Sequence, residues 1–291
     1  IEECIYGVDI QPVACQIAKL RFFIALIVDQ KRRPTADNLG VTPLPNLETR
    51  IVAANGLLSI ETAEGSHYDM FAGSIQKYRE ELYRVRHKHF EAKDSRTKKA
   101  LRERDAELRN LIAEELEENG LQSEKAKKLA SWNPYSQTGT ADFFDPSWMF
   151  GFKQDDALFD IVLANPPYVR QEKIKHLKDE LKPHYPHTFK GTADLYVYFY
   201  ERALQLLRPG GTFSFITSNK WFRSAYGENL RKHLGRSASL LHVIDFGDAD
   251  VFTAIAYPTI VVGRKLKPAD GHKFKSLNWD PETPRSEIDN F

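Results

Sequence analysis

An asparagine, two prolines and a tyrosine, residues 165–168, directly follow the apolar run 159–164. A proline has a fixed φ and no N–H, so a β-ladder cannot continue through Pro166 and Pro167. Proline also holds the residue before it in an extended conformation, which stiffens both Asn165 and Pro166. The sequence therefore predicts a strand that ends at Asn165 and presents its carboxamide at a rigid corner. A proline-rich turn with a chance tyrosine is the plainer alternative.

Such a corner suits the alkylation of a flat, weak nucleophile. The exocyclic amine of a nucleobase must be drawn toward tetrahedral geometry before it can attack a methyl group. The side-chain oxygen of Asn165 and the carbonyl of Pro166 can accept the two amine hydrogens, and the ring of Tyr168 can stack on a base rotated out of a duplex. Pro167 keeps the segment rigid. Neither a metal nor a general base is needed. Once the amine has taken the methyl group from a sulfonium donor, the proton on its nitrogen is acidic, and water can take it.

Composition limits the class of protein. With 291 residues, 42% of them apolar, the chain can bury a core and carry an insertion. A net charge of +1 excludes a strong overall field, so any contact with nucleic acid must be local. No apolar stretch reaches the ~18 residues of a membrane span, and a cytoplasmic protein is expected. Cys4 and Cys15 lack metal-ligand spacing and are expected to be buried.

Strands alternate with helices along most of the chain. A strand ends at Asp9 before a helix that begins near Pro12, and others are predicted in 49–58, 159–164 and 212–219. A helix from about Ala193 and a Pro-Gly-Gly turn precede the last of these, and two more strands follow. This order predicts an α/β fold, a Rossmann-like, mostly parallel sheet with helices on both faces, and ligands bind at the carboxyl ends of such strands. The polar residues expected there are Asp9, Asn55, Asn165 and Asn219.

A long insertion interrupts this pattern, which gives expected divisions at residues 1–70, 71–156 and 157–291. The first part of the insertion is rich in Glu, Lys, Arg and Leu and predicts one or two long, charged helices. A solvated helical hairpin is the usual meaning of such a run. The alternative is a basic arm on DNA, with contacts through Arg84, Arg86, Lys88, Lys98 and Lys99. The second part, 132–152, predicts an ordered aromatic loop packed onto the sheet, and Asn-Pro-Tyr at 133–135 is read as a chance echo of the corner.

Four segments carry a resemblance to a known family: "GVDIQPVACQIAKLR", "NPPYVRQEKI", "GTADLYVYFYERAL" and "LLRPGGTFSFITSNKWFRSAYGENLR". With them the chain resembles the gamma-type, N6-adenine-specific DNA methyltransferases of restriction-modification and phage-defence systems, of the type IIG kind. The resemblance implies S-adenosyl-L-methionine as cofactor and a flipped adenine in double-stranded DNA as substrate. It also implies a target recognition domain in the same polypeptide of a bacterium or archaeon, and it leaves open whether a nuclease domain is fused there.

The resemblance also implies residue roles. Asp9, with Ile10 beside it, matches the acidic position that accepts hydrogen bonds from the cofactor ribose, although a helix N-cap is an alternative. Asn55 matches the position that contacts the cofactor adenine, with turn chemistry beside Gly56 as its alternative. Asp194 matches the motif that lines the far side of the pocket.

For the substrate base, the resemblance places the adenine between Tyr168 and Phe252, although Phe252 suits a hydrophobic core equally well. The family's glycine-rich first motif should end one strand before Cys4, and nothing in the chain corresponds to it. We therefore expect a piece of a longer enzyme that binds the cofactor weakly and methylates little alone. Two rival functions stay open: methylation of a protein glutamine or of RNA, and a catalytically silent interaction module.

Overall fold

A computed structural model describes residues 4–28, 30–31, 35, 40–41, 45–60, 73–152, 159–247 and 257–279. Phe252 and the expected divisions at 70/71 and 156/157 lie outside these residues. The described chain forms two compact units, one within residues 4–152 and the other within 159–279. The helical insertion belongs to the same unit as the first strands.

The first unit begins with two short parallel strands and a helix: β1 (Gly7–Asp9), α1 (Pro12–Val28) and β2 (Ile51–Ala53), with the 3-10 helix η2 (Leu47–Thr49) before β2. Proline at the first position of α1 has no N–H to lose there, which explains why the helix begins where the sequence predicts. Cys15 is buried in the core of this unit. Cys4 is exposed, so its expected burial is wrong.

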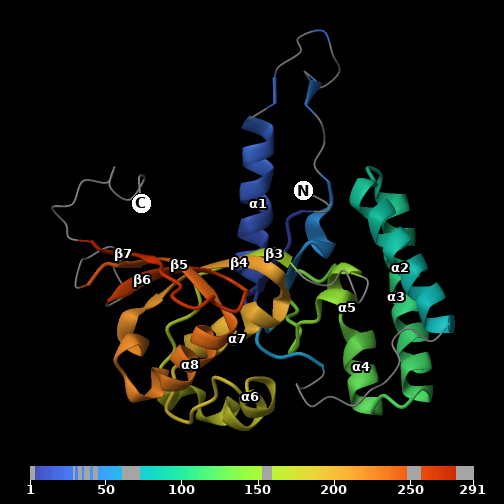
Figure 1. Cartoon of the computed structure of the whole chain (residues 1–291). Coiled ribbons are helices and arrows are strands. Elements are labelled where there is room, and N and C mark those ends of the chain that lie inside the picture. The colour runs from blue at the N-terminus through green and yellow to red at the C-terminus, as the bar shows by residue number, and fades with distance from the viewer. Residues whose placement is uncertain are drawn as a thin grey trace. The chain divides into compact units, whose positions relative to one another are not determined.

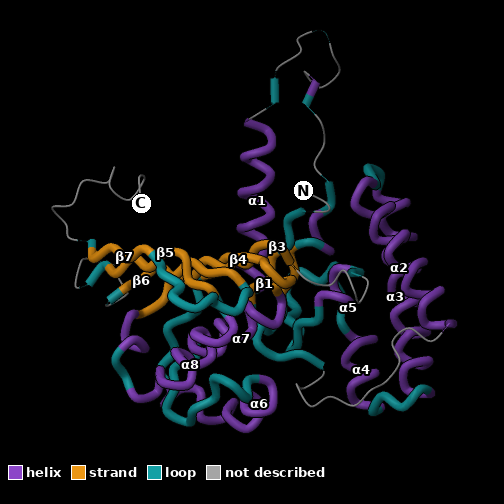
Figure 2. Tube along the Cα trace, in the orientation of Figure 1, coloured by secondary structure: helices purple, strands orange, loops and turns teal. Residues whose placement is uncertain are grey.

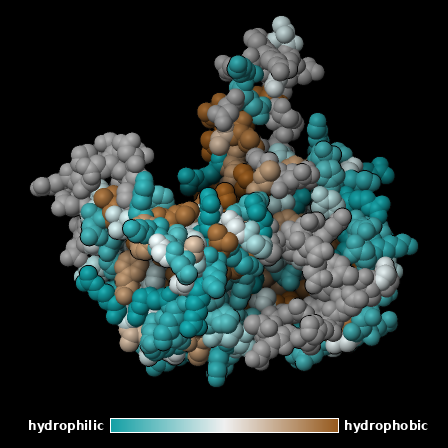
Figure 3. Space-filling view, in the orientation of Figure 1, coloured by the Kyte–Doolittle hydropathy of each residue, from teal (hydrophilic) through white to brown (hydrophobic). Residues whose placement is uncertain are grey.

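One side of α1 carries an exposed apolar stripe, which we call the α1 stripe. It consists of Val13, Ile17, Leu20, Ile24 and Val28, each more than half exposed. The positions recur every three or four residues and therefore share one face of the helix. The brown surface of α1 is visible in the space-filling view (Figure 3).

The insertion forms the predicted charged helices, α2 (Gly73–Glu91) and α3 (Ser95–Glu118), followed by α4 (Ser123–Ser131) and α5 (Pro146–Phe150). α2 and α3 lie side by side as a hairpin (Figure 1). Asp94 begins α3 by accepting a hydrogen bond from the amide of Thr97 at 2.8 Å. The hairpin is more than a solvated one, because its inner face buries Leu82, Val85, Leu108 and Ile112.

A buried charge cluster joins the two helices. The carboxylate of Asp105 lies 2.8 Å from Arg86 Nε and 2.8 Å from Arg109 Nε, and it also accepts a hydrogen bond from Tyr135 Oη at 3.2 Å. Burial alone would raise the pKa of Asp105, but the two guanidinium groups hold it below its ordinary value. Arg86 is therefore a structural residue and not a DNA contact. Tyr135 has a structural role as well, which agrees with reading 133–135 as unrelated to the corner.

The aromatic loop is ordered and packs onto the sheet, as expected. Phe143, Phe144 and Trp148 are buried. The backbone of Ala141 continues the pairing beyond β2, since its N–H donates to Ala53 O at 3.0 Å and its carbonyl accepts from Asn55 N at 2.9 Å. The loop thereby covers the edge of β2.

The second unit contains a five-stranded sheet in the order β3-β4-β6-β5-β7 (Figure 2). Its strands are β3 (Phe159–Ala164), β4 (Leu207–Ser218), β5 (Ser239–Asp245), β6 (Pro258–Arg264) and β7 (Lys275–Asn278). Its helices are η4 (Gln171–Leu177), α6 (Lys178–His184), α7 (Tyr196–Leu206), η5 (Asn219–Phe222), η6 (Ala225–Gly227) and α8 (Glu228–Ser237). α7 and α8 lie on the same face of the sheet (Figure 1).

The fold is α/β as predicted, but the sheet is mixed. β3 pairs parallel to β4 and β5 parallel to β7, whereas β6 is antiparallel to both β4 and β5. The expected mostly parallel order is thus only partly met. The reason is that helix–strand alternation stops after α8, and without a crossover helix a neighbouring strand can return antiparallel.

The predicted Pro-Gly-Gly turn is a bulge inside β4. Leu207 lies opposite Phe159 and Thr212 opposite Ile161, so β4 takes five steps where β3 takes two. Gly210 adopts a φ of 77°, which a side chain would resist. Two backbone hydrogen bonds join the glycines of the bulge to Lys265: Gly210 N donates to Lys265 O, and Lys265 N donates to Gly211 O, each at 2.8 Å.

Candidate active site

The corner after β3 has the predicted form. Pro166 is buried and anchors it, while Asn165 and Pro167 are exposed. The carbonyl of Pro167 accepts the amide of Val169 at 2.9 Å, which makes the chain turn at once. Within the described residues, neither the Asn165 side chain nor the Pro166 carbonyl has a hydrogen-bond partner. Two neighbouring acceptors are therefore available to a ligand.

Tyr168 lies half-buried next to this pair. Its ring centroid is 6.1 Å from that of Tyr196, and the two rings are tilted by 41°. Burial raises the pKa of Tyr168 to about 12, so the phenol is neutral at physiological pH. Its hydroxyl is buried and has no partner among the described residues. A buried hydroxyl without a partner is costly, and a ligand atom that reached it would remove that cost.

Asp194 fastens the corner to the start of α7. Its Oδ1 accepts the amide of Gln171 at 2.9 Å, and the amide of Leu195 donates to Val169 O at 3.0 Å. These bonds place Tyr196 against Tyr168, and the Tyr196 hydroxyl lies 2.8 Å from that of Tyr226. The structure thus brings the 165–168 corner and the 194–196 motif together.

A second polar group forms where β4 ends, and sequence reasoning identified only Asn219 there. Asn219 Nδ2 donates to Asp245 Oδ1 at 2.8 Å, and Asn219 N donates to Tyr257 O at 2.8 Å. Tyr257 is strained, with a φ of 64°, and its ring centroid lies 5.7 Å from Lys220 Nζ. Asp245 follows the strand-end rule that identified Asn219, so this rule could have found it. Nothing in the sequence marked Tyr257.

Trp221 and Tyr226, next to this group, were not assigned to the site. Trp221 is buried and packs 5.5 Å from the ring of Tyr200, which is a core role. Tyr226 is half-buried, and burial raises its pKa. Its hydrogen bond to Tyr196 connects it to the wall beside the corner.

In the first unit, Asp9 and Asn55 stand at the ends of paired strands. The bond from Ala54 N to Asp9 O, 2.9 Å, holds the two ends together. Asp9 Oδ1 accepts the amide of Gln11 at 2.7 Å, which shapes the turn before α1 rather than capping the helix itself. Asp9 is exposed, and its second carboxylate oxygen has no partner in the described chain.

Ile10 and Asn55 complete this strand end. The side chain of Ile10 is 58% exposed, while its carbonyl accepts the Thr140 hydroxyl at 3.1 Å. Asn55 Oδ1 accepts the amide of Leu57 at 3.2 Å, which is the turn chemistry that the sequence left open. An exposed carboxylate oxygen beside an exposed apolar surface fits a nucleoside with a ribose diol. The residues present therefore fit the expected cofactor.

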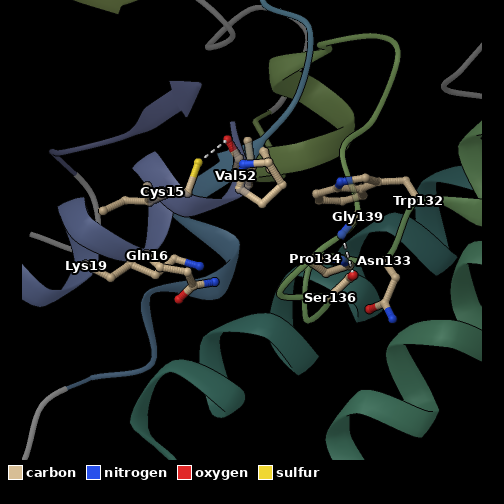
Figure 4. A pocket seen from close by; sticks show the side chains of 12 residues that line it. Cys15, Gln16, Lys19, Val52, Trp132, Asn133, Pro134, Ser136 and Gly139 are labelled. Carbon is tan, nitrogen blue, oxygen red and sulfur yellow. Dashed lines mark hydrogen bonds between the residues drawn. The ribbon is translucent and has the colours of Figure 1, made fainter. Parts of the chain in front are cut away.

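The pocket in Figure 4 is a different feature of this unit. It lies between α1 and the loop 132–139, lined by residues that include Gln16, Lys19 and Trp132, and Cys15 Sγ donates to Val52 O at 3.2 Å. Its interior of about 10 Å³ has room for about one water molecule. A nucleoside cannot enter it, so Asp9 and Ile10 remain the better candidates.

The chain thus combines an α/β fold with polar side chains at the ends of its strands. The chain belongs to the Eco57I restriction-modification methylase family, which matches residues 3–252. This membership confirms the resemblance to methyltransferases of restriction-modification systems, and with it the methyltransferase fold and S-adenosyl-L-methionine as the cofactor.

Individual relatives cover shorter stretches. The type II methyltransferase M.XhoI of Xanthomonas vasicola is 42% identical over 115 residues, 38% of this chain and 20% of that protein. The type II restriction enzyme and methyltransferase RM.Eco57I of Escherichia coli is 31% identical over 97 residues, 32% of this chain and 10% of that protein. The chain therefore spans a fifth or less of the length of these relatives.

Among solved structures, the type IIG restriction endonuclease BpuSI is 21% identical, with 53% of this chain and 18% of that chain covered. The TM-score is 0.31. Within the part of the chain that the structure describes, no helix combines the length and the apolar character of a membrane span.

Proposed function

We propose that the enzyme containing this chain transfers a methyl group from S-adenosyl-L-methionine to N6 of an adenine flipped out of double-stranded DNA. The observation that carries the proposal is a pair of acceptors, the Asn165 carboxamide oxygen and the Pro166 carbonyl, which have no partner among the described residues and lie at a rigid strand end beside Tyr168. The enzyme would work in the cytoplasm of a bacterium or archaeon.

The two acceptors would each take one hydrogen of the adenine amine. Both hydrogens then lie to one side of the nitrogen, and its lone pair is withdrawn from conjugation with the ring and directed at the methyl group. Preorganised polar groups of this kind need no rearrangement during the reaction. Once the new bond has formed, the amine proton is acidic and passes to water, so Asn165 acts as an acceptor and not as a base.

Tyr168 would hold the plane of the adenine by stacking. Stacking of a base on an aromatic side chain contributes about 1 to 3 kcal/mol. The hydroxyl of the neutral phenol, which has no partner among the described residues, would lie next to the base. Phe252 is proposed on the opposite face of the adenine. The hydrogen bond from Gln171 N to Asp194 Oδ1 helps to keep Tyr168 and Tyr196 in place. Asp194 itself is proposed to line the pocket from the far side.

Asp9, Ile10 and Asn55 would hold the cofactor, which supplies an activated methyl group when bound. The exposed oxygen of Asp9 can accept the ribose hydroxyls, and Ile10 offers an apolar surface to the adenine ring. Asn55 can accept a further hydrogen bond at its side-chain oxygen, since that oxygen has a second lone pair. A target recognition domain and a nuclease domain are proposed in the remaining length of the polypeptide.

The test uses the whole enzyme with tritiated S-adenosyl-L-methionine and duplex DNA. Asn165→Ala should lower methyl transfer by about a hundredfold or more, as loss of one preorganised group at a transition state does. Cofactor binding should be unchanged. The matched control is Asn133→Ala, which alters the asparagine of the similar Asn-Pro-Tyr sequence at 133–135. Digestion of the labelled DNA should release N6-methyladenine.

Three outcomes contradict the proposal. Label in a protein glutamine or in RNA, with none in DNA, identifies the other substrates that such a corner can serve. Absence of label in any substrate indicates a silent interaction module. Equal loss of activity in Asn133→Ala and Asn165→Ala means that the corner has no special part in the reaction.

A further inference from the structure

Charge is unevenly distributed along the α2–α3 hairpin. We call residues 88–102 the hairpin tip: the end of α2, the connection 92–94 and the first two turns of α3. The tip contains two acidic residues, Glu91 and Asp94, and six basic ones, Lys88, Lys93, Arg96, Lys98, Lys99 and Arg102. Further along α3, residues 103–120 reverse the balance, with seven acidic and two basic residues. The positive charge of the hairpin is therefore concentrated at one end.

The basic side chains at the tip surround an open depression. It is lined by Lys93, Ser95, Lys98, Lys99 and Arg102 and has a volume of about 330 Å³. Lys98 and Arg102 are four residues apart in α3, so they lie on the same face, one turn of about 5.4 Å from each other. The depression thus brings together basic side chains from the connection and from α3.

Most of this charge is not neutralised locally. Within the described residues, no ion pair involves Lys88, Lys93, Arg96 or Lys98, and Lys99 reaches Glu103 only at 3.9 Å with both side chains exposed. Arg102 is held in place, since Nη2 lies 3.4 Å from Glu48 Oε1 and Nε donates to His89 Nε2 at 3.1 Å. One fixed guanidinium and several free ammonium groups therefore face solvent together.

The other arginines of the hairpin provide the contrast. Arg86 and Arg109 form ion pairs with the buried carboxylate of Asp105, and Arg104 pairs with Glu81 and Glu107. Among the described residues of the tip, by contrast, only Lys99 and Arg102 have an acidic partner. The chemistry of the tip fits a polyanion with closely spaced charges, and double-stranded DNA carries one phosphate charge per about 1.7 Å of its axis.

We propose that the hairpin tip binds the phosphate backbone of double-stranded DNA without reading its sequence. The choice of DNA as the polyanion rests on the proposed function, while the basic depression itself does not. Contacts of this kind position a duplex and contribute affinity, and sequence recognition comes from elsewhere. The tip differs from the basic arm considered from the sequence, because Arg84 and Arg86 are excluded and Lys93, Arg96 and Arg102 are added.

The experiment measures binding of the full chain to a fluorescent duplex by anisotropy at several salt concentrations. The variant replaces three lysines that line the depression, Lys93→Gln, Lys98→Gln and Lys99→Gln. Its affinity should fall about tenfold to a hundredfold at low salt. The slope of log K against log salt should fall by about 0.9 for each lost phosphate contact, or about 2 to 3 in all. Both changes should be the same for unrelated DNA sequences.

The matched control removes three charges from the same unit away from the tip, Lys77→Gln, Lys125→Gln and Lys127→Gln, and should bind within about twofold of the unmodified chain. Far-ultraviolet circular dichroism checks that both variants retain their helices. Equal binding by the tip variant and the unmodified chain overturns the proposal. So does equal loss in both triple variants, or an unmodified chain that does not bind duplex DNA at low salt.

Failure here and failure of the proposed function have different signatures. If the tip variant of the whole enzyme binds DNA normally and methylates it normally, the tip proposal fails alone. If DNA binds at the tip with the expected salt slope but the whole enzyme never methylates it, the proposed reaction fails alone. Asn165→Ala should leave the salt slope of DNA binding unchanged.

Discussion

Asn219 and Asp245 join the ends of two strands that are not neighbours in the sheet. Asn219 follows β4 and Asp245 ends β5, with β6 between the two strands, and the amide donates to the carboxylate at 2.8 Å. The same carboxylate accepts the amide of Gly247 at 3.1 Å. This bond crosses the start of β6 and holds the carboxyl ends of β4 and β5 together, next to the strained Tyr257.

Removing this bond should therefore be more costly than removing an ordinary one. We expect Asn219→Ala to lower the free energy of unfolding by about 1.5 to 3 kcal/mol, since the acceptor is charged. Urea denaturation measures it. The control is Asn229→Ala, where the amide donates to the neutral carbonyl of Phe189 at 2.8 Å and the expected loss is about 1 kcal/mol. Equal losses would mean that the charge of Asp245 adds nothing.

Tyr168 allows stability and function to be separated. Tyr168→Phe removes a buried hydroxyl that has no partner in the described residues, so the free energy of unfolding should rise by about 1 kcal/mol. The ring remains, and methyl transfer by the whole enzyme should stay within about tenfold. Tyr168→Ala should lose stacking and most activity. Thermal unfolding and methylation assays measure the two effects, and a destabilised Tyr168→Phe would show that the hydroxyl has a partner.

The buried carboxylate of Asp105 should be among the most sensitive positions in the first unit. Asp105→Asn leaves Arg86 and Arg109 buried without a counter-charge, and the expected cost is about 3 to 5 kcal/mol. Glu107→Gln, which weakens only the exposed pair with Arg104, should cost several times less. Urea denaturation followed by the circular dichroism of the helices distinguishes them.

The same carboxylate predicts a loss of stability in acid. The pKa of Asp105 is lower in the folded than in the unfolded state, so the unfolded state takes up the proton first. The contribution is present above the unfolded pKa of about 4 and disappears as the pH falls through the lower folded value. Asp105→Asn should show less of this acid dependence. An unchanged acid limb in the variant would contradict the assignment.

His233 predicts a second pH effect, in a milder range. Burial, and then the charge of His187 stacked at 4.9 Å, lowers the pKa of His233 to about 4. The unfolded histidine titrates near 6.5, so the unfolded state binds more protons between these values and stability falls as the pH drops from 6.5 to 4. Because the ring is partly exposed, solvent screening reduces the expected loss to about 1 kcal/mol. His233→Gln should flatten the profile in that interval.

Local features were predictable from the sequence because their causes are local. The end of β3 follows from two prolines, the start of α1 from a third, and the long hairpin helices from composition. Asp9, Asn55, Asn165 and Asn219 were predicted by one rule, that ligands bind at the carboxyl ends of the strands of an α/β sheet, and the structure has each of them at or next to a strand end. The directions of β6 and β7 depend on pairing between distant segments, which periodicity does not encode.

The charges of the insertion show a different limit. In sequence, Arg86, Asp105 and Arg109 look the same as the surrounding exposed residues. Only the packing of α2 against α3 shows that these three are buried and Lys93 and Lys98 are not. The hydrogen bond of Asp194 could not be predicted for a similar reason, because its donor is the backbone amide of Gln171, which no side chain marks in the sequence.

The α1 stripe also affects how the chain behaves when it is concentrated. The five aliphatic side chains of the α1 stripe keep a continuous apolar surface in contact with water. When two molecules pack their stripes together, that water is released. Self-association should therefore increase with the concentration of the chain, and its free energy should scale with the apolar area that each contact buries. Leu20→Lys, in the middle of the α1 stripe, would interrupt this surface without changing either strand end.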